Sequence, residues 1–318
     1  MLIKNVRMWI NGEKNHGCLL VEEGKIVSVE AGGCKDRKVD RIIDGKGQLL
    51  IPGMIDVHIH GAEGYDMMDG TTESVEAVSR ACAKTGCTSF LATSVSSSLE
   101  DLLIMIDRVA AVAGGREPGA EIIGMHIEGP YLNAKRKGMQ NERYLRHPDL
   151  DEMERMVEAA GSLIRMVTLA PELPGGIELI EWLQTRSIIA AIAHSDATYD
   201  EAKQAFESGA NHVTHCFNGM RPIHHRDPGM IVAAFEESGV SVQAIVDNVH
   251  LHPAIVRLMY REKGADRMVL ITDALQAMGM GDGTYAFGGH EVEVKGGVAR
   301  LADGTLASST VTMNEALA

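Results

Sequence analysis

The chain has 318 residues, of which 45% are apolar and 23% are charged, and its formal net charge is −14. This acidity argues against nucleic-acid binding, because phosphate contacts need lysine and arginine. No run approaches the ~18 consecutive apolar residues of a membrane span, and the apolar run at the N-terminus breaks too early for a signal peptide.

The cysteines are odd in number and scattered in spacing, which does not resemble a disulfide framework. They are Cys18, Cys34, Cys82, Cys87 and Cys216. We therefore expect reduced thiols and a cytoplasmic protein.

Residues 1–50 alternate apolar and polar side chains around Asn-Gly, Glu-Gly and Asp-Gly turns, which predicts a small antiparallel β unit. A side-chain pattern typical of strands returns over residues 283–310. We expect this segment to be the second part of the same small β domain, a β-sandwich built from both ends of the chain.

Residues 51–282 alternate short apolar runs with helical patterns. The runs are "MIDVHIHG", "SFLATSVS", "EIIGMHIEG", "IRMVTLAPE", "SIIAAIAHSD", "NHVTHCFN", "VSVQAIVDN" and "MVLITDA". Eight strands with crossover helices predict the α/β class and a (β/α)8, TIM-like barrel.

Residues 311–318 read as the start of a helix. A barrel needs a helix after its eighth strand, and little chain remains to supply one. We expect the C-terminus to be truncated, and this expectation leaves open whether the chain is active.

Ionisable residues recur where the barrel runs end. They are His58, His60, His126, Glu128, His194, His215, His250 and Asp273. The C-terminal ends of barrel strands meet on one face, which holds the active site. His58 and His60 are two apart on a strand, so both side chains point to the same side and can grip one ion.

Imidazole and carboxylate ligands together suit zinc, iron or another borderline divalent metal. Glu128, His194 and His215 can hold the same ion as His58 and His60 or a neighbouring ion. A carboxylate between two such clusters can bridge two metals, as in two-metal hydrolytic sites.

Other histidines have simpler interpretations. His126 and His212 are expected to be hydrogen-bonded core residues. Side chains alternate between the two faces of a strand, and these two histidines are not expected on the face of the predicted ligands. His16, His147 and His290 lie outside the strand ends and are expected on the surface.

Several linked segments carry a family resemblance in order along the chain. They are the H-x-H pair, "GMHIEGPYLNAKRKGMQN", "AHSDAT", "THCFNGMRPIHHRDPG", "DNVHLHP", "ITDAL" and "DGTLASS". The chain resembles the N-acetylglucosamine-6-phosphate deacetylase family of the amidohydrolase superfamily from about residue 1 to residue 318.

The resemblance implies a metal site. Glu128, His194 and His215 match the ligands common to the family, and His58 and His60 match a pair found only in members that hold a second metal. The implied cofactor is one or two divalent ions, most naturally Zn²⁺ or Fe²⁺.

The resemblance also implies roles around the substrate. Asp273 matches the catalytic acid and base, and His250 matches the residue that contacts the acyl carbonyl. Arg226 matches a phosphate-binding arginine supplied by a neighbouring subunit, which implies a homodimer. The implied substrate contacts are Met139, Gln140, Asn218, Gly219, Arg226, His250, Leu306, Ala307 and Ser308.

Three small residues depart from the family pattern. Gly219 stands where the family usually has Ala, Ser308 where it usually has Gly, and Ala193 where a Gly is common. These changes bear on fine specificity more than on the reaction.

The segment "RPIHHRDPG" forms a local cationic loop in an acidic protein, with Arg221, Arg226 and two histidines. It can be a solvated surface loop. Phosphate binding is the favoured interpretation, because arginine suits bidentate phosphate recognition.

The expected function is hydrolysis of N-acetyl-D-glucosamine 6-phosphate to D-glucosamine 6-phosphate and acetate by a metal-activated water, in amino-sugar catabolism or recycling. One alternative is an amidohydrolase acting on another N-acetylated sugar phosphate or a cyclic amide. Another is a non-catalytic relative that only binds a ligand or partner, and the complete set of site residues argues against it. No nucleic-acid or membrane partner is expected.

Overall fold

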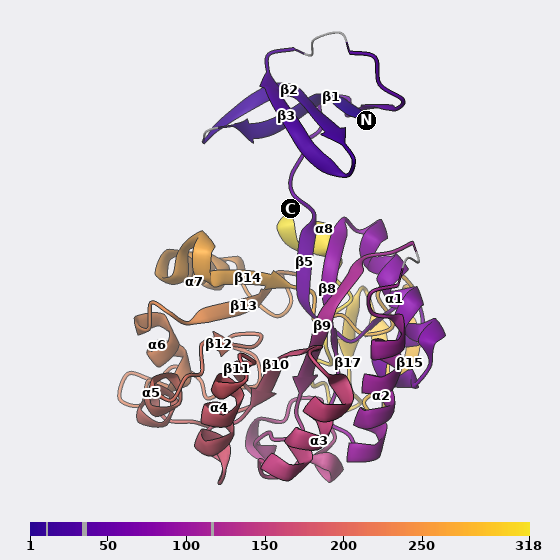
Figure 1. Ribbon diagram of the computed structural model, residues 1–318. Coiled ribbons are helices and arrows are strands. Elements are labelled where there is room, and N and C mark those ends of the chain that lie inside the picture. The colour runs from indigo at the N-terminus through magenta and orange to yellow at the C-terminus, as the bar shows by residue number, and fades with distance from the viewer. Residues whose placement is uncertain (11, 34–36, 116–117) are drawn as a thin grey trace. The chain divides into compact units, whose positions relative to one another are not determined.

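The computed structural model describes residues 1–10, 12–33, 37–115 and 118–318, and these residues form two compact units, Met1–Gly53 and Met54–Ala318 (Figure 1). The strands of the first unit are β1 Leu2–Ile10, β2 Glu13–Glu22, β3 Lys25–Ala31 and β4 Ile42–Asp44.

The first unit is one sheet with strand order β3-β2-β1-β4. Leu2, Cys18 and Leu20 form its small apolar core. The expectation of a wholly antiparallel unit is wrong for β4, which pairs with β1 in parallel. The expectation of reduced thiols is wrong for Cys18, which is disulfide-bonded.

The second unit contains the predicted barrel. Its barrel strands are β5 Met54–Ile59, β8 Cys87–Thr93, β9 Glu121–Glu128, β10 Ile164–Leu169, β11 Ile189–Ile192, β12 His212–Val213, β13 Ser241–Ile245 and β14 Met268–Ile271. They form one eight-stranded parallel sheet in chain order. The prediction of eight barrel strands is confirmed.

Helices flank the barrel strands, as Figure 1 shows. They are α1 Thr72–Lys84, α2 Leu99–Val112, α3 Leu150–Ala160, α4 Gly176–Thr185, α5 Tyr199–Glu207, α6 Gly229–Glu236 and α7 Pro253–Arg267. Their buried faces, which include Val78 of α1, Leu102 of α2 and Met153 of α3, join Phe90 and Val167 of the strands in one apolar core. Within the described part of the chain, no helix is long and apolar enough to cross a membrane.

Hydrogen bonds between β5 and the segment after β14 bring the two edges of the sheet together. The Asp273 amide donates to the His58 carbonyl at 2.8 Å, and the His60 amide donates to the Ala274 carbonyl at 2.9 Å. The Asp56 carboxylate adds a bond from the Thr272 hydroxyl at 2.6 Å. The barrel therefore closes at the residues predicted to carry chemistry.

Shorter elements complete the second unit. They are β6 Gly61–Ala62, β7 Tyr65–Asp66, η1 Met67–Asp69, η2 Ala134–Arg136, η3 Glu142–Tyr144, β15 Gly283–Phe287, β16 His290–Lys295, β17 Val298–Arg300 and α8 Met313–Leu317. The strands β15, β16 and β17 form their own three-stranded sheet. Phe287, Val292 and Ala299 of this sheet pack against Val95 and Leu275 of the barrel unit. The proposed assembly of residues 283–310 with residues 1–50 into one domain stays a prediction.

The α2 helix allows a matched test of the core. Leu102 is fully buried, whereas Ile104 on the same helix is 42% exposed. We expect Leu102→Ala to lower the free energy of unfolding by about 2–5 kcal/mol, because it leaves a cavity in a packed layer. We expect Ile104→Ala to cost about 0.5 kcal/mol or less. Urea denaturation measures both, and equal costs would contradict the packing described here.

Candidate metal centre and active-site pocket

Six ionisable side chains gather where the barrel strands end. His58 and His60 come from β5 and the residue after it, and Glu128 ends β9. His194, His215 and Asp273 each follow a strand by two residues and have positive φ angles of 44°, 30° and 49°. Left-handed backbone at residues other than glycine costs of order 1 kcal/mol or more and concentrates at functional sites. These turns bend the chain sharply just after each strand, at the residue whose side chain enters the site.

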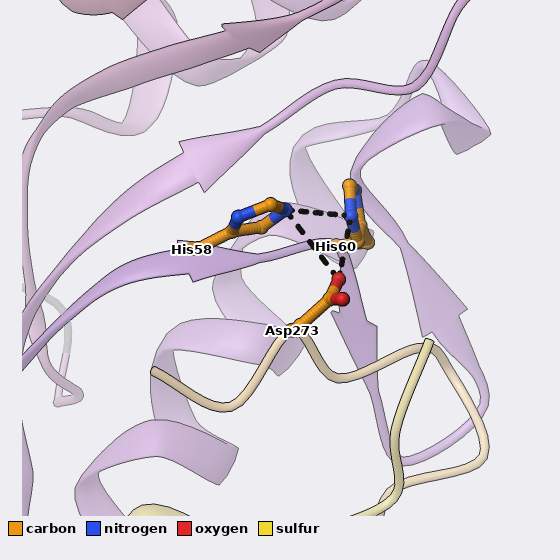
Figure 2. Close-up of side chains that lie close together, drawn as sticks. All are labelled: His58, His60 and Asp273. Carbon is orange, nitrogen blue, oxygen red and sulfur yellow. Dashed lines mark hydrogen bonds and ion pairs between the residues drawn. The ribbon is translucent and has the colours of Figure 1, made fainter. Parts of the chain in front are cut away.

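The first group consists of His58, His60 and Asp273, which are all buried. The Nε2 atoms of His58 and His60 lie 3.1 Å apart. Asp273 Oδ1 lies 3.4 Å from His58 Nε2 and 3.2 Å from His60 Nε2. Figure 2 shows the three side chains pointing toward one another. The predicted histidine pair is thus joined by a carboxylate from the far end of the barrel.

The second group consists of Glu128, His194 and His215, also buried. His215 Nε2 lies 3.0 Å from Glu128 Oε1 and 3.1 Å from His194 Nε2. Both groups have the composition and compactness of a divalent-metal site.

Glu128 connects the two groups. Its Oε1 lies 3.5 Å from His58 Nε2, and its Oε2 lies 3.5 Å from His60 Nε2. Gln140 donates from Nε2 to Glu128 Oε2 at 2.8 Å and so orients the carboxylate. Glu128 is therefore a carboxylate that lies between the two clusters, the position from which a carboxylate can bridge two metals.

The hydrogen bonds at the Nδ1 atoms of His194 and His215 indicate whether their Nε2 atoms can bind a cation. His194 Nδ1 lies 2.9 Å from the Arg136 carbonyl, and His215 Nδ1 lies 3.1 Å from the Asn218 carbonyl. A carbonyl oxygen only accepts, so each Nδ1 carries the proton and each Nε2 offers a lone pair. Two lone pairs 3.1 Å apart repel each other unless a positive charge lies between them. The donor arrangement therefore fits a metal ion.

The ionisation states of the site residues also favour a metal ion. Burial disfavours a charged His58 ring, but Glu128 and Asp273 outweigh this effect and raise its pKa to about 9. Burial also disfavours a charged Asp273, but His58 and His60 outweigh it and lower the pKa of Asp273 to about 2. The site thus holds an ionised Asp273 beside a positively charged His58 ring, and a divalent cation that displaced the proton of His58 would supply the positive charge in its place.

A cavity of about 300 Å³ opens over the second group and over Asp273 of the first group. Its lining residues are Glu128, Gly138, Met139, Gln140, His194, His215, Asn218, Gly219, His250, Asp273, Arg300, Gly304, Thr305, Leu306 and Ser308. His250 is held by Asp247, whose Oδ2 lies 2.7 Å from His250 Nδ1. The cavity joins most of the predicted substrate residues to the metal-ligand groups.

Two predicted substrate residues do not line this cavity. Ala307 is fully buried beside it, between Leu306 and Ser308, which do line it. Arg226 is exposed, and its Nη1 lies 2.7 Å from His225 Nε2. Arg226 therefore does not reach the cavity of its own chain.

Arg221 differs from Arg226 although both belong to the same cationic loop. Its guanidinium forms ion pairs with Asp227 at 2.5 Å and with Asp196 at 3.2 Å. Arg221 thus stabilises the loop, and its charge is already balanced within the chain.

The remaining histidines mostly follow the expectations. His126 is a buried core residue whose Nε2 lies 2.7 Å from the Thr168 hydroxyl. His16 and His147 are exposed. His290 is half-buried, and its Nε2 is buried without a hydrogen-bond partner. His212 is buried, as expected, and its Nε2 also has no hydrogen-bond partner.

Sequence reasoning missed several residues at the site. Gly138, Gly304 and Thr305 line the cavity and lie within two of the family segments quoted above, and Arg300 lies three residues before the second of these segments. Gln243 contacts ligands of both groups. Its signal was a polar residue in the middle of the apolar run "VSVQAIVDN".

A family model described as "Amidohydrolase family" matches residues 49–284, which is most of the chain and includes every residue of the two metal-ligand groups. The chain belongs to the amidohydrolase family. Members of this family are divalent-metal-dependent hydrolases of amide bonds, and the two ligand groups agree with that chemistry.

Individual amidohydrolases are similar over nearly the whole chain. An N-acetylglucosamine-6-phosphate deacetylase from Bacillus subtilis (strain 168) is 38% identical over 319 residues, covering 99% of this chain and 81% of the relative. An N-acetylgalactosamine-6-phosphate deacetylase from Escherichia coli O157:H7 is 35% identical, covering 87% and 73%.

A solved amidohydrolase structure has the same fold. It is a mutant of N-acetyl-D-glucosamine-6-phosphate deacetylase from Mycobacterium smegmatis in complex with N-acetyl-D-glucosamine-6-phosphate. The TM-score is 0.90 at 37% identity, covering 99% of this chain and 82% of that chain.

Proposed function

We propose that this chain hydrolyses the acetamide of N-acetyl-D-glucosamine 6-phosphate to give D-glucosamine 6-phosphate and acetate, in amino-sugar catabolism or recycling. The observation that carries the proposal is one cavity that joins Asp273 and His250 to Glu128, His194 and His215, three of the candidate metal ligands. The names of the similar proteins support the same substrate.

The proposed metal ligands are the five residues Glu128, His194, His215, His58 and His60. The first three would hold the ion common to the family, and the last two, with Asp273 beside them, would hold a second. A bound divalent ion lowers the pKa of a water toward ~7 and polarises a carbonyl. The nitrogen and oxygen donors favour Zn²⁺ or Fe²⁺.

Asp273 is the proposed general base and acid. It takes a proton from the attacking water and returns one to the leaving nitrogen. Ser308 Oγ donates a hydrogen bond to Asp273 Oδ1 at 3.3 Å, which orients the carboxylate for both transfers.

His250 is the proposed contact to the acyl oxygen. Asp247 holds the His250 ring through Nδ1, which leaves Nε2 as the nitrogen available to the substrate. The proposed sugar-phosphate contacts are Met139, Gln140, Asn218, Gly219, Leu306, Ala307 and Ser308. A cavity of about 300 Å³ is of the size of a small-ligand site.

The proposed assembly is a homodimer in which Arg226 serves the neighbouring subunit's site. Arg226 is exposed and does not line the cavity of its own chain, which supports this arrangement. We propose a cytoplasmic location, supported by the free thiols of Cys82, Cys87 and Cys216, whereas the disulfide at Cys18 does not support it.

A second candidate substrate is N-acetyl-D-galactosamine 6-phosphate, because one similar protein carries that name. The two sugars differ in the orientation of one hydroxyl, so binding contacts decide between them. We expect acetate release to have the higher kcat/KM with the glucosamine derivative, and no turnover of a cyclic amide. A higher kcat/KM for the galactosamine derivative would replace the proposed substrate.

Asp273→Asn tests the proposed proton transfers. The variant keeps the shape of the side chain but loses the base. We expect kcat for acetate release to fall by about 10³-fold or more while substrate binding changes little. Metal content is measured in the same samples, so that loss of an ion is not mistaken for loss of the base. A kcat like that of the wild type would refute the assignment.

Arg226→Ala tests the phosphate contact and the dimer together. Loss of a charged hydrogen bond is worth ~1.5–3 kcal/mol, so we expect KM to rise about 10–100-fold with a smaller change in kcat. Mixing Arg226→Ala with Asp273→Asn subunits should restore low-KM activity, because one site of each mixed dimer pairs an intact Asp273 with the partner's intact arginine. An unchanged KM in the single variant, or no recovery on mixing, would contradict the proposal.

A further inference from the structure

Gln243 is a polar residue at the centre of β13, and its side chain is completely buried in the barrel. Its neighbours in the strand, Val242 and Ala244, are buried apolar residues. A buried amide destabilises the fold unless its hydrogen-bonding groups are satisfied. The partners of Gln243 therefore show what the residue does.

The Gln243 side chain contacts one residue from each metal-ligand group. Its Oε1 lies 3.1 Å from His58 Nδ1 and 3.3 Å from the backbone nitrogen of His215. Its Nε2 lies 3.6 Å from Met166 Sδ. A single oxygen thus touches both groups.

These contacts fix the proton on His58. A backbone N–H only donates, so the Gln243 atom facing the His215 amide must be the acceptor Oε1. His58 Nδ1 faces the same oxygen and must therefore carry a proton. In the neutral ring, the lone pair then resides on Nε2, the nitrogen that faces His60 and Asp273.

The other ligand histidines differ from His58 in how the ring is held. His194 and His215 donate to backbone carbonyls, and His60 Nδ1 is buried without a partner. Among the described contacts of these rings, only His58 therefore has its Nδ1 fixed by a side chain, which a substitution can remove.

We propose that Gln243 is a positioning residue of the metal centre. It holds His58 as the Nδ1–H tautomer, so that Nε2 can bind a divalent cation in the His58–His60–Asp273 group, and its bond to the His215 amide links this group to the other. The inference rests on the proposed metal-binding role of the first group.

Gln243→Met tests the proposal, because methionine has a similar length and offers only a weak acceptor. The measurement is Zn²⁺ binding to metal-free protein in competition with a chromophoric chelator. We expect two binding steps in the wild type. In Gln243→Met, one step weakens by about 10–100-fold, as is typical when the hydrogen-bond partner of a ligand histidine is lost. His60→Ala, which removes a ligand of the first group, should affect the same step.

Two matched variants separate the acceptor from packing. Gln243→Glu keeps an oxygen at the same position and should bind Zn²⁺ about as tightly as the wild type. Met166→Leu removes the sulfur that faces Nε2 but keeps the acceptor and the volume, so it should leave both steps unchanged. Thermal melting of each metal-free variant confirms that it is folded.

A second measurement does not depend on any change at Gln243. Histidine-selective ¹⁵N spectra of the zinc-loaded wild type, assigned with a His58→Gln variant, should show His58 protonated at Nδ1 and metal-bound at Nε2. A ring bound through Nδ1 would overturn the inference even if Gln243→Met did not fold.

The outcomes distinguish this inference from the function on which it rests. Two wild-type steps that Gln243→Met leaves unchanged would overturn the role of Gln243 alone, as would an equal weakening in Met166→Leu. A wild type that binds one Zn²⁺, in a step insensitive to His60→Ala, would overturn the second metal and the inference together.

Discussion

The site depends on how the barrel closes. The first and last strands meet through the bond from the Asp273 amide to the His58 carbonyl, and the Asp56 carboxylate joins Thr272 to the same strand. This closure brings together residues more than two hundred positions apart in the chain. Without it, the carboxylate and the two imidazoles of the first group would not share one small volume. The geometry of the reaction centre is thus a consequence of sheet closure.

Burial determines the energetic cost of the charged side chains in the reaction centre. Glu128 and Asp273 are nearly inaccessible to water, and isolated charges in such surroundings are costly. The histidines offset part of this cost, and the left-handed turns that aim them add local strain. The apolar core around Phe90 and Leu102 supplies the stability that permits this arrangement. The rest of the barrel stabilises an arrangement of side chains that fits a cation. A bound cation would in turn offset the cost of burying the carboxylates.

Much of this was predictable from the sequence. Eight apolar runs placed the strands, and the strand ends placed both ligand groups, because the side-chain period and the common face of a barrel are general rules. The parallel pairing of β4 and the disulfide at Cys18 were not predictable, since pairing partners depend on tertiary contacts. Gln243 was also missed, because its contacts join residues far apart in the chain. The assignment of Arg226 came only through the family resemblance.

The most direct test measures bound metal and acetate release from N-acetyl-D-glucosamine 6-phosphate in the same samples, while Zn²⁺ or Fe²⁺ is titrated into metal-free protein. If the two groups form the reaction centre, the metal-free protein is inactive, and acetate release rises in step with the ion bound by Glu128, His194 and His215. Full activity without metal, or metal-loaded protein that releases no acetate, would contradict the account.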